Sequence, residues 1–190
     1  MVQMLRSLLG AWNGLVSFFL LAKPRLFGLR TGGGVRVGGG IDWPLGRVRN
    51  IQIGAGVSLG RRGWFYVPLN NPLAKIQIGP GTAIGNDFVI SANNSILIGN
   101  DCLVSYRVSI LDHSHITGAG IKPTTSGLTG GQPIKIGEGC FIGCGAVIHP
   151  GVELGPNSIV EANSVVMRSF PAGSVVSGAP ARLLRLIATT

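Results

Sequence analysis

An aliphatic residue followed by glycine recurs at six-residue intervals along much of this 190-residue chain. The pattern reads Ile78-Gly79, Ile84-Gly85 and Ile98-Gly99, and it returns after a gap as Ile136-Gly137 and Ile142-Gly143. A six-residue period is the signature of a parallel β-helix, in which each repeat supplies one side of a coil and the aliphatic side chains share one interior. We expect the glycine to permit a backbone conformation that a β-carbon would disfavour. The repeat therefore predicts an all-β solenoid.

The composition agrees with a solenoid and limits the partners. Hydrophobic residues make up 45% of the chain and charged residues only 12%, as expected where each coil buries a ring of Ile, Val and Leu. The formal net charge is nevertheless +9. This charge favours a phosphorylated cofactor or substrate, an anionic membrane surface, or nucleic acid. No aromatic–basic platform or known nucleic-acid motif accompanies it, so no nucleic acid is expected as a partner.

The cysteines indicate the compartment. Cys102, Cys140 and Cys144 are an odd number and do not form the dense framework of a disulfide-stapled secreted protein. We interpret them as small side chains in a reducing compartment, and the predicted localisation is cytoplasmic.

Residues 1–30 are predicted to form an N-terminal amphipathic helix. Apolar residues recur there at spacings of three and four, and the helix should end near Pro24. The apolar stretch over 8–22 is shorter than the ~20 residues of a membrane span, and a signal-peptide cleavage site is poor. The helix either caps the solenoid or lies on the inner face of the membrane, where Arg25, Arg30 and Arg36 suit anionic headgroups.

The β-helix itself is predicted over residues 31–178. Residues 116–132 break the six-residue phase and contain five glycines, which predicts a protruding loop. A loop of this length inside a regular solenoid is usually functional or disordered. Gly178-Ala179-Pro180 ends the repeat, and the sequence from Ala181 to Ile187 predicts a short C-terminal helix within a final helix and tail over 179–190.

From His113 to Arg185 the chain resembles the hexapeptide-repeat acyltransferases, in particular their sugar and polysaccharide O-acetyltransferase branch. The resemblance rests on Asp112-His113 ahead of a glycine-rich loop, on the blocks 136–143 and 159–166, and on the terminal 178–182, which is similar to the family's Gly-x-Pro-Ala-Lys/Arg. It implies a left-handed β-helix and a homotrimer. It also implies acetyl-CoA as acyl donor in a groove between neighbouring solenoids, with no metal.

The resemblance implies that His113 is the general base. Neutral imidazole near pH 7 can remove the proton of a hydroxyl as it attacks a thioester. Because alternate residues of extended backbone share a face, His115 is expected on the same side. Asn93 or Asn94, about one coil earlier, corresponds to an acceptor-binding Asn of the sugar branch, and Asn93 is taken as the candidate. Asn93, Asp112 and His115 are therefore candidate substrate contacts.

Six positions are candidate contacts of acetyl-CoA on the same resemblance. Cys144 and Ala162 match positions where backbone atoms line the pantetheine groove, and Phe141 replaces a frequent Trp. Arg168, Arg182 and Arg185 suit the phosphates of the cofactor, because guanidinium binds phosphate bidentately.

Other functions remain open. N-acetyl transfer to an amino sugar or nucleotide sugar would use the same base and groove, and a non-catalytic scaffold would use the solenoid as a binding surface. A zinc hydratase would need three convergent His ligands, and the chain has only His113, His115 and His149, without the usual wider spacing. We predict an acetyl-CoA-dependent enzyme that acetylates a hydroxyl of a sugar or surface polysaccharide precursor.

Overall fold

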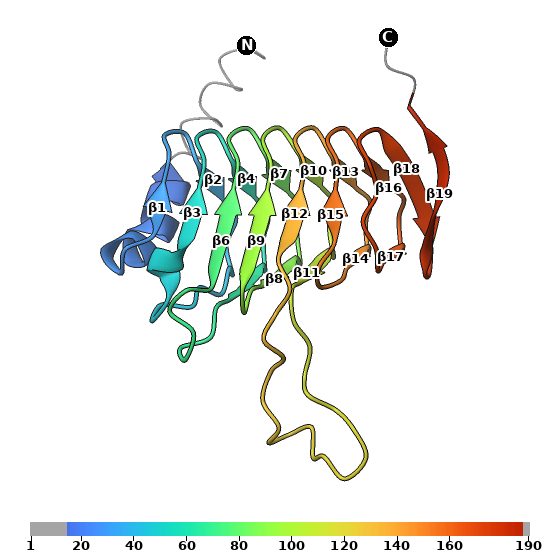
Figure 1. The fold of residues 1–190 in the computed structure, drawn as a ribbon. Coiled ribbons are helices and arrows are strands. Elements are labelled where there is room, and N and C mark those ends of the chain that lie inside the picture. The colour runs from blue at the N-terminus through green and yellow to red at the C-terminus, as the bar shows by residue number, and fades with distance from the viewer. Residues whose placement is uncertain (1–14, 188–190) are drawn as a thin grey trace.

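The computed structural model describes residues 15–187, and its strands form three sheets that are the three sides of a solenoid and are parallel except at the last strand of one sheet. In each coil the chain follows the first sheet, crosses to the second and returns along the third. Figure 1 shows the coils advancing from the N-terminal end to the C-terminal end with a left-handed turn. The predicted left-handed parallel β-helix is confirmed.

Strands one coil apart pair in register, so each sheet is a stack. The first sheet contains β1 (Arg30–Thr31), β3 (Ile51–Ile53), β6 (Lys75–Ile78), β9 (Ser95–Ile98), β12 (Ile134–Ile136) and β15 (Glu153–Leu154). The second contains β2 (Arg36–Val37), β4 (Ser58–Leu59), β7 (Ala83–Ile84), β10 (Leu103–Val104), β13 (Phe141–Ile142), β16 (Ile159–Val160), β18 (Ser174–Gly178) and β19 (Ala181–Leu186). The third contains β5 (Trp64–Tyr66), β8 (Val89–Ser91), β11 (Ser109–Leu111), β14 (Val147–Ile148) and β17 (Val165–Val166). A short 3-10 helix, η1 (Val48–Asn50), precedes β3.

Aliphatic side chains fill the interior, as the repeat predicts. Ile76, Ile96 and Ile134 are paired neighbours in the first sheet, and each is at most 1% exposed. Leu97, next to Ile96, faces outward and is 39% exposed. Successive side chains of a strand point to opposite faces, so the period of the sequence separates interior from surface.

The glycine after each aliphatic residue has a different role from the one predicted. A β-carbon at Gly99 would lie 2.6 Å from the backbone nitrogen of Glu138 in the next coil, and one at Gly143 would lie 2.5 Å from that of Ala162. Close approach of coils, rather than an unusual backbone angle, therefore requires glycine at these positions. The left-handed conformation occurs two residues later, as at Gly145 (φ 68°), where the chain turns the corner.

Residues 15–26 form a helix that covers the N-terminal end of the solenoid. Leu21 is 1% exposed, and the Ser17 hydroxyl accepts a hydrogen bond from the backbone N–H of Val37 at 3.0 Å. The helix continues past Pro24, where we predicted its end, because the carbonyls of Lys23 and Pro24 still accept hydrogen bonds from Phe27. The predicted helical residues 1–14 lie outside the described part. Among the described residues, no helix has the length and apolar character needed to cross a membrane.

The predicted C-terminal helix is wrong. Residues Ala181–Leu186 form β19, which pairs antiparallel with β18 after a turn at Ala179-Pro180. The Ala, Leu and Arg residues of this segment have high helix propensity. The last coil, however, leaves a sheet edge of unpaired N–H and C=O groups. Pairing with that edge satisfies these groups, so tertiary context overrides local propensity.

A long loop leaves the solenoid between β11 and β12 and projects from the corner between the third and first sheets (Figure 1). Its two arms run side by side near the base, where His115 and Leu128 form an isolated bridge. The backbone N–H of Ile116 also donates to the carbonyl of Gly127 at 3.1 Å. The break in the repeat over 116–132 thus falls within this projecting segment.

Replacing Ile98 by alanine should lower the free energy of unfolding by about 2–5 kcal/mol, because it leaves a cavity in the core. Ile98 is 0% exposed and pairs with Ile78 and Ile136 in the neighbouring coils. Leu97→Ala is the matched control and should cost less than about 0.5 kcal/mol. Urea denaturation followed by circular dichroism measures both variants. Equal losses would contradict the assigned orientation of β9.

Candidate active site

A pocket of about 470 Å³ opens at the corner from which the long loop projects. Tyr66, Ser91 and Leu111 are paired neighbours at the ends of β5, β8 and β11, so their outward side chains form one row. The base of the loop closes the pocket on the other side. Its complete lining is Trp64, Tyr66, Ser91, Leu111, His113, Ser114, His115 and Leu128.

A histidine and a buried carboxylate form the polar centre of this pocket. Nδ1 of His113 lies 2.8 Å from Oδ1 of Asp112, and the Asp112 side chain is 0% exposed. The backbone N–H groups of Asn93 and Asn94 donate to the same carboxylate at 2.7 and 2.8 Å. These hydrogen bonds give the oxygens of the buried Asp112 carboxylate their partners.

The carboxylate fixes the tautomer of His113. An ionised carboxylate only accepts hydrogen bonds, so Nδ1 of His113 carries the proton. Nε2 then holds the lone pair, and it lies 3.4 Å from the Ser91 hydroxyl oxygen. A base oriented by a third group in this way is the arrangement that activates a hydroxyl nucleophile.

The three predicted substrate contacts have different surroundings. His115 is exposed and lines the pocket together with His113. Asn93 lies beside the pocket, and its side-chain amide donates to the carbonyl of Thr129 at 2.6 Å, which ties the loop to the preceding coil. Asp112 lies beneath the surface with its oxygens engaged by three donors. Direct contact with a substrate does not fit this burial, which instead suits support of His113.

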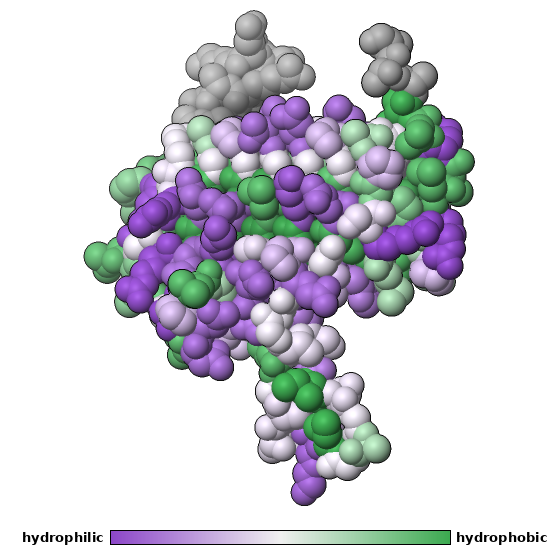
Figure 2. All heavy atoms as spheres, viewed as in Figure 1, coloured by the Kyte–Doolittle hydropathy of each residue, from purple (hydrophilic) through white to green (hydrophobic). Residues whose placement is uncertain are grey.

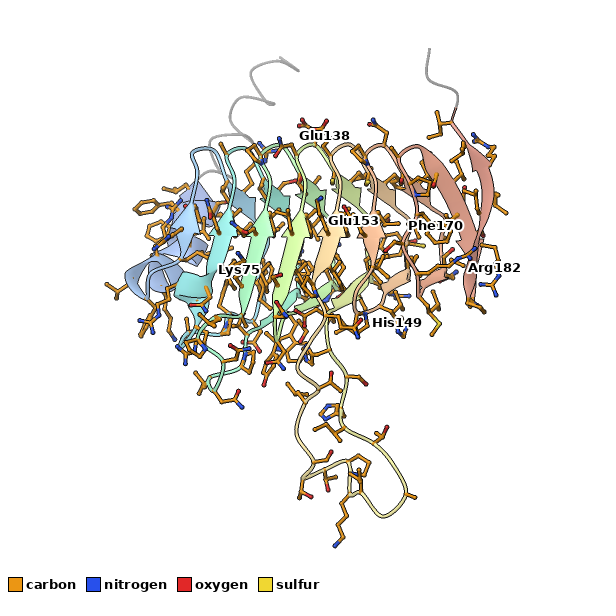
Figure 3. The ribbon with its side chains drawn as sticks, in the orientation of Figure 1. Lys75, Glu138, His149, Glu153, Phe170 and Arg182 are labelled. Atoms are coloured by element: carbon orange, nitrogen blue, oxygen red, sulfur yellow. The ribbon has the colours of Figure 1, made fainter. Side chains whose placement is uncertain are left out.

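Three of the six predicted acetyl-CoA positions fall along one corner. Cys144 and Ala162 occupy the corner between the second and third sheets in consecutive coils, where the N–H of Asn163 donates to the carbonyl of Cys144 at 2.8 Å. Arg182 pairs with Ser177 near this corner, at the C-terminal end (Figure 3). A row of small corner residues that leads to a guanidinium fits an extended, phosphate-bearing ligand such as acetyl-CoA.

The other three positions lie elsewhere. Phe141 is on the outer face of the second sheet, and Arg185 pairs with Val175 at the far end of β18. Arg168 lies at the corner between the third and first sheets, with its guanidinium 5.1 Å from the ring centroid of Phe170. The three arginines therefore do not form one cluster within a subunit.

Within a single subunit, the corner row formed by Cys144, Ala162 and Arg182 also lies apart from His113. Cys144 precedes β14 of the third sheet, whereas His113 follows β11 at the opposite end of the same sheet. The two halves of the predicted site consequently lie on two different corners of the triangular coil.

Six of the eight residues that line the pocket were not predicted from the sequence, among them Trp64, Tyr66 and Ser91. Trp64 and Tyr66 fall where the repeat is blurred by nearby prolines, so their phase could not be assigned. Ser91 offered a clearer signal. It pairs with Leu111 of the next coil, and Leu111 lies two residues before His113. Aligning consecutive coils on their buried isoleucines would have placed Ser91 beside the histidine.

The cysteines and possible metal ligands give no second site here. Cys102 and Cys140 are buried in the interior. The neighbouring Cys102 thiol and burial both raise the pKa of Cys140, so this thiol stays protonated. Among residues 15–187, no three His, Cys, Asp or Glu side chains are grouped so that they could hold a metal ion.

The sequence comparisons agree with the repeat. Residues 133–168 match the family model described as bacterial transferase hexapeptide (six repeats), which confirms the predicted resemblance. WbbJ of Escherichia coli K12, whose name refers to lipopolysaccharide biosynthesis and O-acetyl transfer, is 32% identical over 53% of this chain and 55% of its own length. The galactoside O-acetyltransferase of the same organism is 29% identical over 68% of this chain and 64% of its own length. The chain thus spans less than two thirds of each of these relatives.

Solved structures show the same solenoid. The hexapeptide-repeat acetyltransferase VCA0836 of Vibrio cholerae, solved with acetyl-CoA, has a TM-score of 0.56 and 29% identity, and the match covers 69% of this chain and 71% of VCA0836. AntD, an N-acyltransferase of Bacillus cereus, has a TM-score of 0.69 over 85% of this chain and 86% of its own, but at 18% identity it shows the fold alone. The fold and the matched repeats are those of hexapeptide-repeat transferases.

Proposed function

We propose that this protein transfers an acetyl group from acetyl-CoA to a hydroxyl of a sugar or surface polysaccharide precursor. The observation that carries the proposal is the oriented base: His113, held by buried Asp112, presents Nε2 beside a pocket. The names of WbbJ and galactoside O-acetyltransferase support a sugar hydroxyl as acceptor. The acetyl-CoA complex of VCA0836 supports the donor.

The mechanism follows from the tautomer of the histidine. Acetyl-CoA supplies the acyl group as an activated thioester. His113 accepts the acceptor's hydroxyl proton at Nε2 while the hydroxyl oxygen attacks the thioester carbonyl. Buried Asp112 stabilises the resulting imidazolium, which then gives the proton to the departing CoA sulfur. The Ser91 hydroxyl, 3.4 Å from Nε2, is placed to hydrogen-bond an acceptor hydroxyl bound at that atom.

A homotrimer is part of the proposal. The corner row of Cys144, Ala162 and Arg182 and the pocket of His113 lie on different corners of one subunit. A neighbouring solenoid that brings its corner row against this pocket would complete the site. The outer face of the second sheet supports such packing, because Leu103 is 50% and Phe141 36% exposed there.

Release of CoA tests the proposed function. Purified protein is mixed with acetyl-CoA and a panel of sugars, nucleotide sugars and glycans, and free thiol is followed over time. We expect release that requires a sugar-containing acceptor. Absence of release with the whole panel, together with no binding of acetyl-CoA by calorimetry, would overturn the proposal in favour of a scaffold.

We also propose that the N-terminal end of the solenoid lies on the inner face of an anionic membrane. Residues 1–75 contain ten basic residues (Lys and Arg) and one acidic residue, whereas residues 76–190 contain six basic and six acidic residues. Large apolar side chains are exposed at the same end, including Phe19 at 67% and Leu26 at 85%. Figure 2 shows apolar surface interspersed with hydrophilic surface there. Apolar insertion and basic residues together favour anionic bilayers.

Vesicle sedimentation tests this membrane contact. The protein should bind vesicles of phosphatidylserine and phosphatidylcholine and should stay unbound with phosphatidylcholine alone. Replacing Leu26 and Phe27 by serine should weaken binding by at least about tenfold, since each buried apolar side chain contributes roughly 1.5–3 kcal/mol. Leu97→Ser is the control on another face. Wild-type protein that stays in solution with anionic vesicles at low salt would contradict the proposal.

A further inference from the structure

A second pocket adjoins the first and shares two of its walls. It measures about 490 Å³, and Trp64 and Tyr66 line both pockets. The remaining lining comes from Phe65 and from two irregular segments, 42–46 and 67–70. Both pockets have the size of small-ligand sites, and their shared walls place the second pocket next to the pocket of His113.

The third sheet explains why this second pocket exists. β5 is the last strand of that sheet on the N-terminal side, and the preceding coil contributes only one bridge, between Asp42 and Trp64. The chain over 42–46 therefore departs from the regular coil instead of forming another strand. This departure leaves Trp64 41% exposed.

Aromatic rings continue in a row from the base. The ring centroids of His113 and Tyr66 are 6.3 Å apart, and those of Tyr66 and Trp64 are 5.5 Å apart. Trp64 and Tyr66 share a face of β5 because alternate side chains of a strand point the same way. The row leads from the reacting group into the second pocket, where the exposed side chains of Asp42 and Asn70 supply a carboxylate and an amide.

We propose that the second pocket is a carbohydrate subsite that binds the sugar residue next to the one acetylated at His113. The C–H bonds of a pyranose face suit the negative face of an aromatic ring. Its hydroxyls suit the carboxylate and amide nearby. The inference rests on the proposed function and narrows it: the preferred acceptor is an oligosaccharide or glycan chain of at least two residues, not a free monosaccharide.

A glycan array with labelled acetyl-CoA tests this subsite. The array carries matched mono-, di- and trisaccharides, and incorporated acetyl label is measured on every spot. The wild-type protein should label glycans of two or more residues at least tenfold more than the matching monosaccharides. Trp64→Ala should lower labelling of glycans of two or more residues at least tenfold more than it lowers labelling of the matching monosaccharides, so that the preference for longer glycans is lost. Leu97→Ala, a similarly exposed apolar residue on another face, should behave as wild type.

Each outcome decides between explanations. Equal wild-type labelling of monosaccharides and longer glycans, or equal losses on both in Trp64→Ala, would overturn the subsite while leaving acetyl transfer intact. Absence of label on every glycan would instead overturn the proposed function. If Trp64→Ala does not fold, Trp64→Leu keeps an apolar side chain without the flat ring and should show the same loss of preference. If Trp64→Ala instead changed the length of the acyl chain that the protein accepts, the pocket would belong to the donor. If it dissociated the oligomer, the pocket would belong to the contact with a neighbouring subunit. Either result would overturn the subsite.

Discussion

Replacing His113 by alanine is expected to lower kcat for acetyl transfer by about 10²–10⁴-fold, the contribution typical of a general base. Nε2 is the only atom of the oriented His113 ring that can accept the acceptor's proton, because Nδ1 donates to Asp112. The Michaelis constant for acetyl-CoA should change little, since the residues proposed to hold the donor lie on another corner. Initial rates of CoA release with a saturating acceptor measure the effect.

His149→Gln is the matched control for His113→Ala. His149 follows β14 one coil later and lies beyond the loop, toward the C-terminal end (Figure 3). It is outside the lining of the pocket, so its replacement should change kcat by less than a few fold. If His113→Ala retained wild-type kcat, or if His149→Gln lost as much, the assignment of the base would be wrong.

Replacing Asp112 by asparagine should lower kcat by about 10²–10⁴-fold with a smaller effect on binding. The amide cannot accept all three hydrogen bonds that the carboxylate receives from Asn93, Asn94 and His113. The imidazole then loses the partner that keeps the proton on Nδ1. Because buried donors lose their acceptor, the free energy of unfolding should also fall by roughly 1–3 kcal/mol.

Nitrogen NMR of the His113 ring separates positioning from mere loss of stability. The wild-type ring should carry its proton on Nδ1, and the Asp112→Asn ring should shift toward the Nε2 tautomer. Asp101→Asn is the control, because Asp101 is an exposed corner residue of the same coil. An unchanged tautomer in Asp112→Asn, with kcat within a few fold of wild type, would show that the carboxylate serves the fold alone.

The sequence was sufficient for the solenoid because one side chain in each repeat must enter a shared interior. Ile98 and Ile136 could be assigned to the core from their period alone, and they are 0% and 1% exposed. The C-terminal strand was not predictable in this way. The helix propensity of Ala181–Leu186 is local, whereas the edge of β18 that captures this segment exists only in the folded coil.

The same distinction applies to the candidate site. His113 was indicated by its motif and its place before the loop, and the structure brings it to a pocket. The stacking of Tyr66 and Ser91 beside it depends on the register between coils, which insertions in the sequence obscure. The separation of Arg182 from Arg185 likewise follows from β19 being a strand and not a helix, whereas Arg168 lies at the corner after β17.

The most direct test of the account is the chemical identity of the product. Protein, acetyl-CoA and a pool of glycans are incubated, and acetylated products are located by mass spectrometry and NMR. We predict a new acetyl ester on a sugar hydroxyl that appears with wild-type protein and disappears with His113→Ala. An acetyl group on a sugar amine, or an acetyl ester that forms equally with His113→Ala, would contradict base-catalysed O-acetyl transfer at this corner of the solenoid.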